Sequence, residues 1–294
     1  MKNLERVETF LAVATHGGFR SAAKHTGLSQ PAVTQHVKQL EQSLNVNLVN
    51  RNNAGSTLTP EGKAFLPYAE NLIRTSDRAI ALFKKDSVVI GSSSNTGIYL
   101  LQPYLKAYKD VSPHKLEVNI GTNTVIADKL QNFEIDVAIM EWWDSRPGFI
   151  STIWRTEDLV VIVPPHHPWS GMRRIPRDWI IGQKLLGGEA GSGTRRLLQD
   201  HFGESANTIG VSMQLGSTEA VKHAVQAGLG ISLVMAASVV NEARSGLLYA
   251  IPIEGDPVRK TLFVIHRDNG LHDAPALQFT NFLLNHDSLK CTRN

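Results

Sequence analysis

A short segment near the start of the chain carries hydrogen-bonding side chains at the spacing of one helix face. Its apolar residues recur at the spacing of a buried stripe: Val33, Val37, Leu40 and Leu44. The remaining side chains then point away from the core, namely Gln30, Pro31, Thr34, Gln35 and Lys38. Glutamine and threonine exchange hydrogen bonds with base edges, and lysine suits a phosphate or a guanine. This face predicts a helix that enters a DNA major groove; a solvated face on a structural helix is the alternative.

The residues before this helix are suited to positioning it. An amphipathic helix that stops at Gly17 and Gly18 is predicted from apolar residues at three- and four-residue spacing: Leu4, Val7, Phe10, Leu11 and Ala14. Ser21 is predicted to cap a second, short helix, and Gly27 provides the turn after it. Ser29 then caps the third helix, whose first turn contains Pro31. The order of helix, glycine turn and helix is that of a helix-turn-helix motif.

Two further elements follow the predicted recognition helix. Residues 46–58 alternate as a two-stranded wing with a polar turn, and Arg51 is placed to reach a phosphate or the minor groove unless it is simply exposed. Thr59 caps a long helix that extends to about residue 86, with Pro67 predicted to kink it. Its apolar stripe needs a partner, either the same helix from a second subunit or its own domain.

These motifs together resemble the LysR-type transcriptional regulators. The resemblance rests on three segments, Ala22–Val33 with Leu40 and Glu41, the wing Leu48–Arg51, and the helix start Leu58–Gly62, and it continues to about residue 285. It implies a homodimer or homotetramer that binds promoter DNA and contacts RNA polymerase. The chain departs from the family at Val49, where phenylalanine is usual, and at Gly188, where arginine is common.

Strand and helix patterns alternate from residue 87 onward, which predicts an α/β domain. The expected division is a winged helix-turn-helix at 1–59, a linker helix for dimerisation at 60–86 and an effector-binding domain at 87–294. The α/β domain is predicted to have two lobes, with lobe I formed by 87–163 and 267–294 and lobe II by 164–266. The resemblance implies a fold like that of the periplasmic binding proteins, with a small polar or anionic effector between the lobes.

Four loops rich in hydroxyl groups and glycine precede helices in this domain. Helix N-termini at strand ends bind small anions, although plain N-capping explains any one such loop equally well. The resemblance implies that nine residues of these loops approach the effector: Ser93, Ser94, Asn95, Thr122, Asn123, Thr124, Thr194, Ser217 and Thr218. Trp142 follows the third predicted strand and is expected to lie over the ligand, because adjacent tryptophans in an extended segment face opposite sides.

Composition and charge limit the classes of protein to which the chain can belong. The chain has 294 residues and a net charge of +3. Residues 1–86 contain eleven basic and seven acidic residues, against nineteen and twenty in the remainder, so the surplus positive charge lies with the predicted DNA-binding helix. The single cysteine, Cys291, excludes an internal disulfide framework and fits a reducing cytoplasm. Apolar runs are too short for a membrane span, and no signal-peptide pattern is present at the N-terminus.

Sequence motifs of common enzymes are absent. The chain has no Gly-x-Ser-x-Gly, no phosphate-binding Gly-x4-Gly-Lys motif and no His-Glu-x-x-His, and no metal ligands recur at a recognisable spacing. We therefore expect a regulator without catalytic residues, metal or cofactor. A small-anion-binding α/β enzyme and a binding module without regulatory output are the alternatives, and specific, salt-sensitive DNA binding would distinguish the regulator from both.

Overall fold

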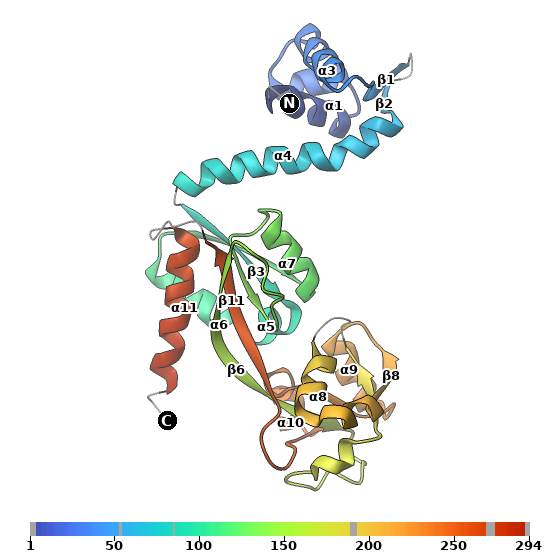
Figure 1. Ribbon diagram of the computed structural model, residues 1–294, viewed down its shortest axis with the longest axis vertical. Helices are drawn as coiled ribbons and strands as arrows, with labels where there is room; N and C mark the ends of the chain where they lie inside the picture. Colours follow the sequence, from blue (N-terminus) through green and yellow to red (C-terminus); the bar gives the residue numbers. More distant parts are fainter. Residues whose placement is uncertain (1–3, 53–54, 85, 189–192, 269–273, 292–294) are drawn as a thin grey trace. The chain divides into compact units, whose positions relative to one another are not determined.

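The computed structural model describes residues 4–52, 55–84, 86–188, 193–268 and 274–291, and the chain divides into two compact units (Figure 1). Unit 1 comprises residues 1–84 together with 132–134, and unit 2 comprises the rest. Within the described residues, no helix has the length and apolarity needed to cross a membrane.

Three helices of unit 1 pack around a small apolar core. They are α1 (Leu4–Thr15), α2 (Phe19–Thr26) and α3 (Gln30–Leu44). Val33, Val37 and Leu40 of α3 are buried against Phe10 of α1, and this confirms the predicted stripe. The prediction that Ser21 caps α2 is wrong, because the helix begins at Phe19 after Gly18 and Ser21 lies inside it. Gly27 ends α2 in the left-handed conformation that the turn requires.

The wing forms as an antiparallel hairpin of β1 (Val49–Asn52) and β2 (Gly55–Leu58). It is fastened to the next helix, α4 (Pro60–Lys84), through Thr59, whose Oγ1 donates to the carbonyl of Asn47 (2.6 Å) and accepts from the amide of Gly62 (2.9 Å). A Cβ on Gly62 would lie 2.0 Å from the carbonyl oxygen of Leu48, so this close approach of helix and strand requires glycine.

The two ends of α4 differ in burial. Ala69 is buried in the core of unit 1 and Phe65 packs against it, whereas Ile80 and Phe83 are 55% and 75% exposed. The helix therefore carries apolar side chains beyond the part that its own domain covers.

A seven-stranded mixed sheet runs through unit 2. Its path is β10-β6-β11-β5-β3-β4, with β9 also paired to β6. The strands are β3 (Ser87–Ser93), β4 (Lys115–Gly121), β5 (Val137–Met140), β6 (Phe149–Val163), β9 (Ser232–Met235), β10 (Tyr249–Ile251) and β11 (Arg259–Arg267). β3 is parallel to β4 and β5, and β11 is antiparallel to β5 and β6.

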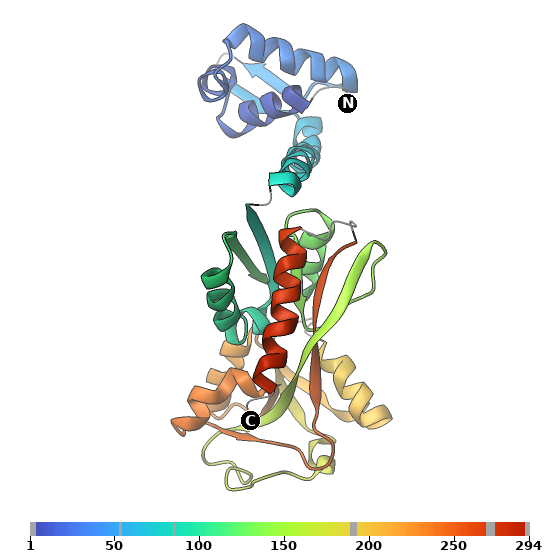
Figure 2. The ribbon, with the colours of Figure 1, turned by 90° about the vertical axis from the view of Figure 1, so that its left-hand side faces the viewer.

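Helices cover both faces of the sheet in lobe I. Val88 and Ile90 of β3 face a core shared with α6 (Gln102–Val111) and α11 (Pro275–Cys291), where the Tyr108 and Phe279 rings meet at 5.0 Å. Val89 faces the other side, under α7 (Asn123–Gln131). Figure 2 shows α11 lying lengthwise along the sheet. The alternation of residues along β3 thus creates two core layers.

The boundary between the lobes lies within β6, earlier than predicted. Up to Asp158 this strand pairs with β11, and from Leu159 it pairs with β9 and β10. The amide of Leu159 donates to the carbonyl of Val258 (2.8 Å), which links β6 at this boundary to the residue before β11. Residues 159–163 therefore belong with lobe II and residues 259–266 with lobe I, unlike the predicted junctions at 163 and 267. Residues 159–163 form the buried end of this strand, whereas its first residues, from Phe149, are largely exposed.

Lobe II adds a second, two-stranded parallel sheet and several helices. They are β7 (Lys184–Gly187), β8 (Gly210–Gln214), α8 (Thr194–Phe202), α9 (Thr218–Gln226) and α10 (Val240–Arg244). Two helices follow β3 in lobe I, α5 (Ser94–Tyr99) and α6, and Pro103 lies in the first turn of α6, where its missing N–H is tolerated. The alternation of strands and helices and the two-lobed α/β class are confirmed.

Candidate functional site

The polar face of α3 lies open on unit 1. Ser29 caps the helix by accepting a hydrogen bond from the amide of Ala32 (3.3 Å). The other predicted residues lie on the uncovered side of the helix, with Gln30, Pro31, Gln35 and Lys38 exposed and Thr34 half-buried. The side chain of Arg51 lies outside the described residues, so its prediction stays a prediction.

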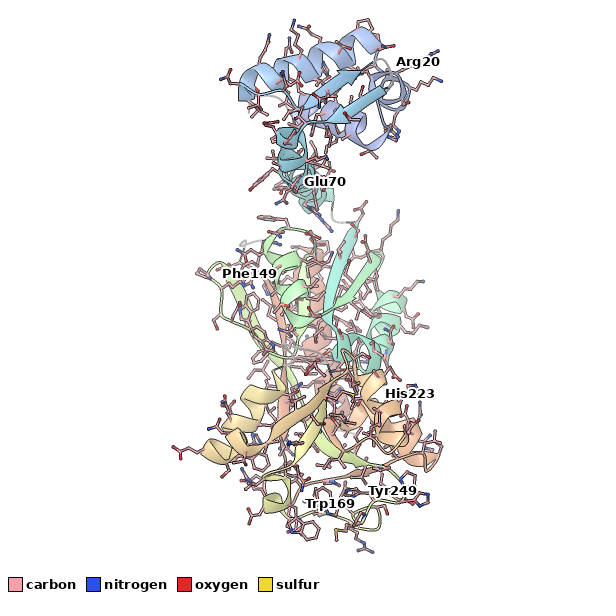
Figure 3. All side chains as sticks on the ribbon, turned by 90° about the vertical axis from the view of Figure 1, so that its right-hand side faces the viewer. Arg20, Glu70, Phe149, Trp169, His223 and Tyr249 are labelled. Carbon is pink, nitrogen blue, oxygen red and sulfur yellow. The ribbon has the colours of Figure 1, made fainter. Side chains whose placement is uncertain are left out.

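Two contacts hold α3 in place. Glu41 accepts hydrogen bonds from the amides of Leu48 (2.8 Å) and Val49 (3.1 Å), which ties the end of α3 to the start of the wing. His36 is hydrogen-bonded through Nδ1 to Thr9 Oγ1 of α1 (3.0 Å), as a packing residue rather than a member of the exposed face. A second exposed cation, Arg20, lies in the first turn of α2 (Figure 3).

Unit 2 contains a cavity of about 640 Å³ between the lobes. Most of its wall is apolar and comes from lobe II: Leu159, Leu185, Leu186, Leu198, Ile209, Val211, Val221, Leu233, Val234 and Met235. The polar lining comes from both lobes: Asn95, Gln214, Thr194, Thr218, Ser232 and Lys260. The volume suits a small molecule, and the uneven lining suits one with an apolar body and a polar end.

Four of the ten predicted effector residues line this cavity, namely Asn95, Trp142, Thr194 and Thr218. Thr218 Oγ1 donates to Asn95 Oδ1 across the lobes (2.6 Å). The Trp142 ring closes against Gly193, where a Cβ would lie 2.8 Å from the ring and where φ is +73°. Trp143 faces elsewhere and packs on Phe149 with ring centroids 5.5 Å apart.

The other six predicted residues do not line the cavity, and most of their side chains satisfy local backbone groups. Ser94 donates to the carbonyl of Gly121 (3.0 Å), and Thr122 accepts from the amide of Val125 (3.3 Å) and pairs with Thr124 (3.1 Å). Ser217 caps α9 by accepting from the amide of Ala220 (3.1 Å). Plain capping, the alternative that the sequence left open, therefore describes Thr122 and Ser217.

Ser93 and Asn123 support the cavity wall from behind. Asn123 donates to the carbonyl of Trp142 (2.9 Å) and accepts from the amide of Glu141 (3.1 Å), which fixes the backbone that carries the tryptophan. Ser93 is buried, and its Oγ lies 3.0 Å from Thr96 Oγ1 and 3.5 Å from Glu141 Oε1.

A buried ion pair at the cavity was not predicted. Lys260 lines the cavity, and its Nζ lies 2.6 Å from Glu141 Oε2, with side chains 5% and 3% exposed. Buried charges of this kind are retained only when they are paired. Lysine and glutamate next to long apolar strand segments were the available signal, since such residues are almost never fully buried without a partner.

The N-termini of two helices also meet the cavity. Thr194 is the first residue of α8, and Thr218 is the first residue of α9, and both line the cavity. Amide groups in the first turn of a helix lack partners within the helix and carry a partial positive charge, which favours an acceptor or anionic group. Among the described residues, no group of three potential metal-ligating side chains comes together.

A charged cluster lies beside the cavity, on α9. Lys222 is buried, and its Nζ lies 2.6 Å from Glu219 Oε1 and 2.7 Å from Glu242 Oε1. Burial favours a raised pKa for Glu219, but hydrogen bonds from Lys222 and Tyr99 outweigh it and lower the pKa overall. Burial likewise acts to lower the pKa of Lys222, but its two carboxylate partners raise it. Both shifts therefore favour the charged forms of Glu219 and Lys222.

Two family models match the chain. The model described as "Bacterial regulatory helix-turn-helix protein, lysR family" matches residues 4–63, and the model described as "LysR substrate binding domain" matches residues 84–288. Neither model includes residues 64–83, which lie between the two matches.

Individual proteins and structures are similar over most of the chain. The putative HTH-type transcriptional regulator protein PtxE of Stutzerimonas stutzeri is 39% identical over 196 residues, which is 66% of this chain and 100% of that protein. The HTH-type transcriptional activator CmpR of Synechocystis is 29% identical and covers 98% of this chain and 97% of its own length. Full-length OxyR from Pseudomonas aeruginosa shares the fold, with a TM-score of 0.64, 20% identity and 97% and 94% coverage of the two chains. CbnR complexed with its target DNA gives a TM-score of 0.57, 22% identity and 96% and 99% coverage.

Proposed function

Because the chain belongs to the LysR family of transcriptional regulators, with a helix-turn-helix domain and an effector-binding domain, we propose that the exposed face of α3 reads its promoter DNA. Gln35 and Thr34 are the candidates for contacts to base edges, and Lys38 is the candidate for a phosphate or a guanine. The observation that carries this proposal is the exposure of these polar side chains on a helix whose opposite side is the core of unit 1.

Neighbouring residues complete the proposed DNA contact. Ser29, Gln30 and Pro31 lie at the N-terminal end of α3, the end that enters the groove in helix-turn-helix proteins. Arg51 of the wing and Arg20 of α2 are the candidates for phosphate contacts on either side.

The cavity between the lobes is the proposed effector site. Asn95, Thr194 and Thr218 would bind the polar end of the effector with Lys260 beside them, and the leucine-rich wall of lobe II would bind its apolar part. Trp142 would cover the ligand. Binding changes transcription only if the effector has different affinities for two arrangements of the protein.

Assembly and location follow from the same proposal. The exposed Ile80 and Phe83 of α4 would be covered by the equivalent helix of a second subunit, which gives a homodimer that reads two half-sites, and two such dimers give the homotetramer. Contact with RNA polymerase and a cytoplasmic location, where promoter DNA is found, belong to this proposal. We propose no catalytic activity, since the relatives named above are transcriptional regulators.

DNA reading is tested by fluorescence polarisation with duplex fragments from the DNA that flanks the gene. We expect Gln35→Ala to weaken specific binding about 10- to 100-fold while binding to unrelated DNA is unchanged. Lys38→Ala, if it contacts phosphate, weakens both and lowers the salt slope by about one unit. Gln42→Ala, later on the same helix, is the matched control. Equal losses on all sequences for Gln35→Ala would show that this side chain does not read bases.

The effector site is tested by thermal-shift measurements on the full-length protein with a panel of small carboxylates and oxyanions. A compound that stabilises unit 2 should lose at least tenfold in affinity in Thr194→Val, while operator affinity is kept. Thr124→Val, whose side chain lies outside the cavity, is the control. A compound that binds both variants equally does not use the α8 end of the cavity.

A further inference from the structure

One face of α5 is bonded across the lobes to the first turn of α9. Asn95 and Tyr99 are four residues apart and therefore lie on the same side of α5 in lobe I. Asn95 accepts a hydrogen bond from Thr218 Oγ1 (2.6 Å), and Tyr99 donates its hydroxyl to Glu219 Oε1 (2.7 Å). Two adjacent residues of lobe II thus bind two adjacent turns of lobe I.

Only the first of these two bonds lies in the cavity wall. Asn95 and Thr218 line the cavity, so the polar end of a ligand competes for the same groups. Tyr99 and Glu219 are not among the lining residues. A ligand in the cavity therefore competes directly for the first bond and not for the second.

Lys222 makes the second bond rigid. The Lys222 side chain is 4% exposed, and its ammonium group holds Glu219 Oε1 at 2.6 Å, while Glu242 Oε1 (2.7 Å) and the carbonyl of Ser238 (3.1 Å) hold the ammonium from lobe II. The same ammonium lies 5.2 Å from the centroid of the Tyr99 ring. A buried cation thus orients the carboxylate toward the tyrosine hydroxyl and also attracts the face of that ring.

We propose that Tyr99, Glu219 and Lys222 form a latch between the lobes that sets how far the effector cavity is closed before any ligand binds. Lys222 and Glu219 are the fixed side, and the Tyr99 hydroxyl is the part that releases. The latch rests on the proposed function of the cavity for its biological role, but its physical action does not depend on a ligand.

The latch predicts different roles for the two hydrogen bonds between the lobes, Thr218–Asn95 and Tyr99–Glu219. A ligand that binds Asn95 and Thr218 replaces one bond between the lobes and leaves the other, so the lobes stay in register while the cavity wall rearranges. Weakening the latch shifts the free protein toward molecules with an open cavity. The apparent ligand affinity then falls in proportion to the fraction of molecules that remain closed.

Distances between the lobes in the free protein test the latch directly. The full-length protein carries Cys291→Ser, with spin labels at Lys109→Cys in lobe I and Glu204→Cys in lobe II. Pulsed electron paramagnetic resonance then measures the distance between the two labels, which reports how far the lobes are open. Dilution with unlabelled protein keeps the distances within one chain. We expect Tyr99→Phe to raise the ratio of open to closed molecules about tenfold, since one hydrogen bond to a charged acceptor is lost. Glu219→Ala should give the same shift, and the double variant no more than Glu219→Ala alone.

Tyr249→Phe is the matched control. Tyr249 is 43% exposed and pairs with Val163 at the end of β6, so it lies at the far end of lobe II (Figure 3). Unchanged distances in Tyr99→Phe would overturn the latch, as would an equal shift in Tyr249→Phe or additive shifts in the double variant. These outcomes involve neither DNA nor ligand, so they are distinct from a failure of operator binding or of ligand binding in the cavity.

Discussion

The recognition helix of unit 1 and the cavity of unit 2 are built in opposite ways. All of the polar side chains proposed to read DNA from α3 lie within one continuous segment of fifteen residues. The cavity lining instead extends from Asn95 to Lys260 and includes parts of both lobes. Helical periodicity alone displays the first site, whereas the second exists only after strands far apart in sequence have paired. Exposed chemistry on one helix is therefore far easier to infer than chemistry collected inside a domain.

All five tryptophans of the chain belong to unit 2, so the two regions can be followed separately. Tryptophan fluorescence therefore reports unfolding of the effector-binding unit alone. Hydrogen exchange or limited proteolysis of residues 4–84 reports the other unit. A substitution that acts on one region should move one readout and not the other.

The largest effect is expected at the buried ion pair. Lys260→Met leaves Glu141 charged and buried, and breaking such a pair costs about 3–5 kcal/mol. We expect this loss in the free energy of unfolding of unit 2, measured by denaturant titration with tryptophan fluorescence. Hydrogen exchange in unit 1, measured without DNA, should be unchanged. Lys260→Met combined with Glu141→Leu should recover most of the loss, because no unpaired charge remains. Lys109→Met, at an exposed lysine, is the control. An equally large loss in this control would show that burial of the Lys260 ion pair is not the cause.

The next largest effect is expected in unit 1. Gly62→Ala places a methyl group 2.0 Å from the carbonyl oxygen of Leu48, and relief of that overlap requires the wing or α4 to move. We expect a cost of about 3 kcal/mol and a severe loss of DNA binding. Hydrogen exchange in residues 4–84 should rise while tryptophan unfolding is unchanged. Gly171→Ala, where nothing lies within 4 Å, should be neutral; normal protection in Gly62→Ala would contradict the close approach.

The smallest effect is a change in pH dependence at Glu219. Because the pKa of Glu219 is lowered in the folded protein, its contribution to stability is complete above the ordinary glutamate pKa of about 4.3 and is lost as the pH falls through the folded pKa. Glu219→Gln should therefore be less stable than the parent at pH 7, and the gap should close below about pH 4. Tryptophan unfolding measured from pH 7 to pH 3.5 checks this. Glu204→Gln, at an exposed glutamate of lobe II, should show no such convergence.

Much of the fold follows from the sequence, and the site follows only in part. The stripe of α3, the left-handed Gly27 and the start of α4 after Thr59 depend on local rules, and each is confirmed. Hydroxyl residues before helices are ambiguous because capping and ligand binding need the same groups. Thr194 and Thr218 line the cavity, while Ser217, one residue earlier, caps the helix.

The features that the sequence did not reveal depend on pairing between distant strands. Lys260 becomes a cavity residue only because β11 brings it beside Glu141, which follows β5. The lobe boundary was misplaced because the first part of β6 is largely exposed and lacks a long apolar run. Neither fact is visible in a window of neighbouring residues.

The passage of β6 from one lobe to the other without a loop has a mechanical consequence. We expect relative motion of the lobes to be concentrated at Asp158 and Leu159, where β6 leaves β11 and joins β9 and β10. In a rotation, displacement grows with distance from the axis. If the lobes rotate about this point, a small displacement at the cavity wall corresponds to a larger displacement at the outer rim of lobe II.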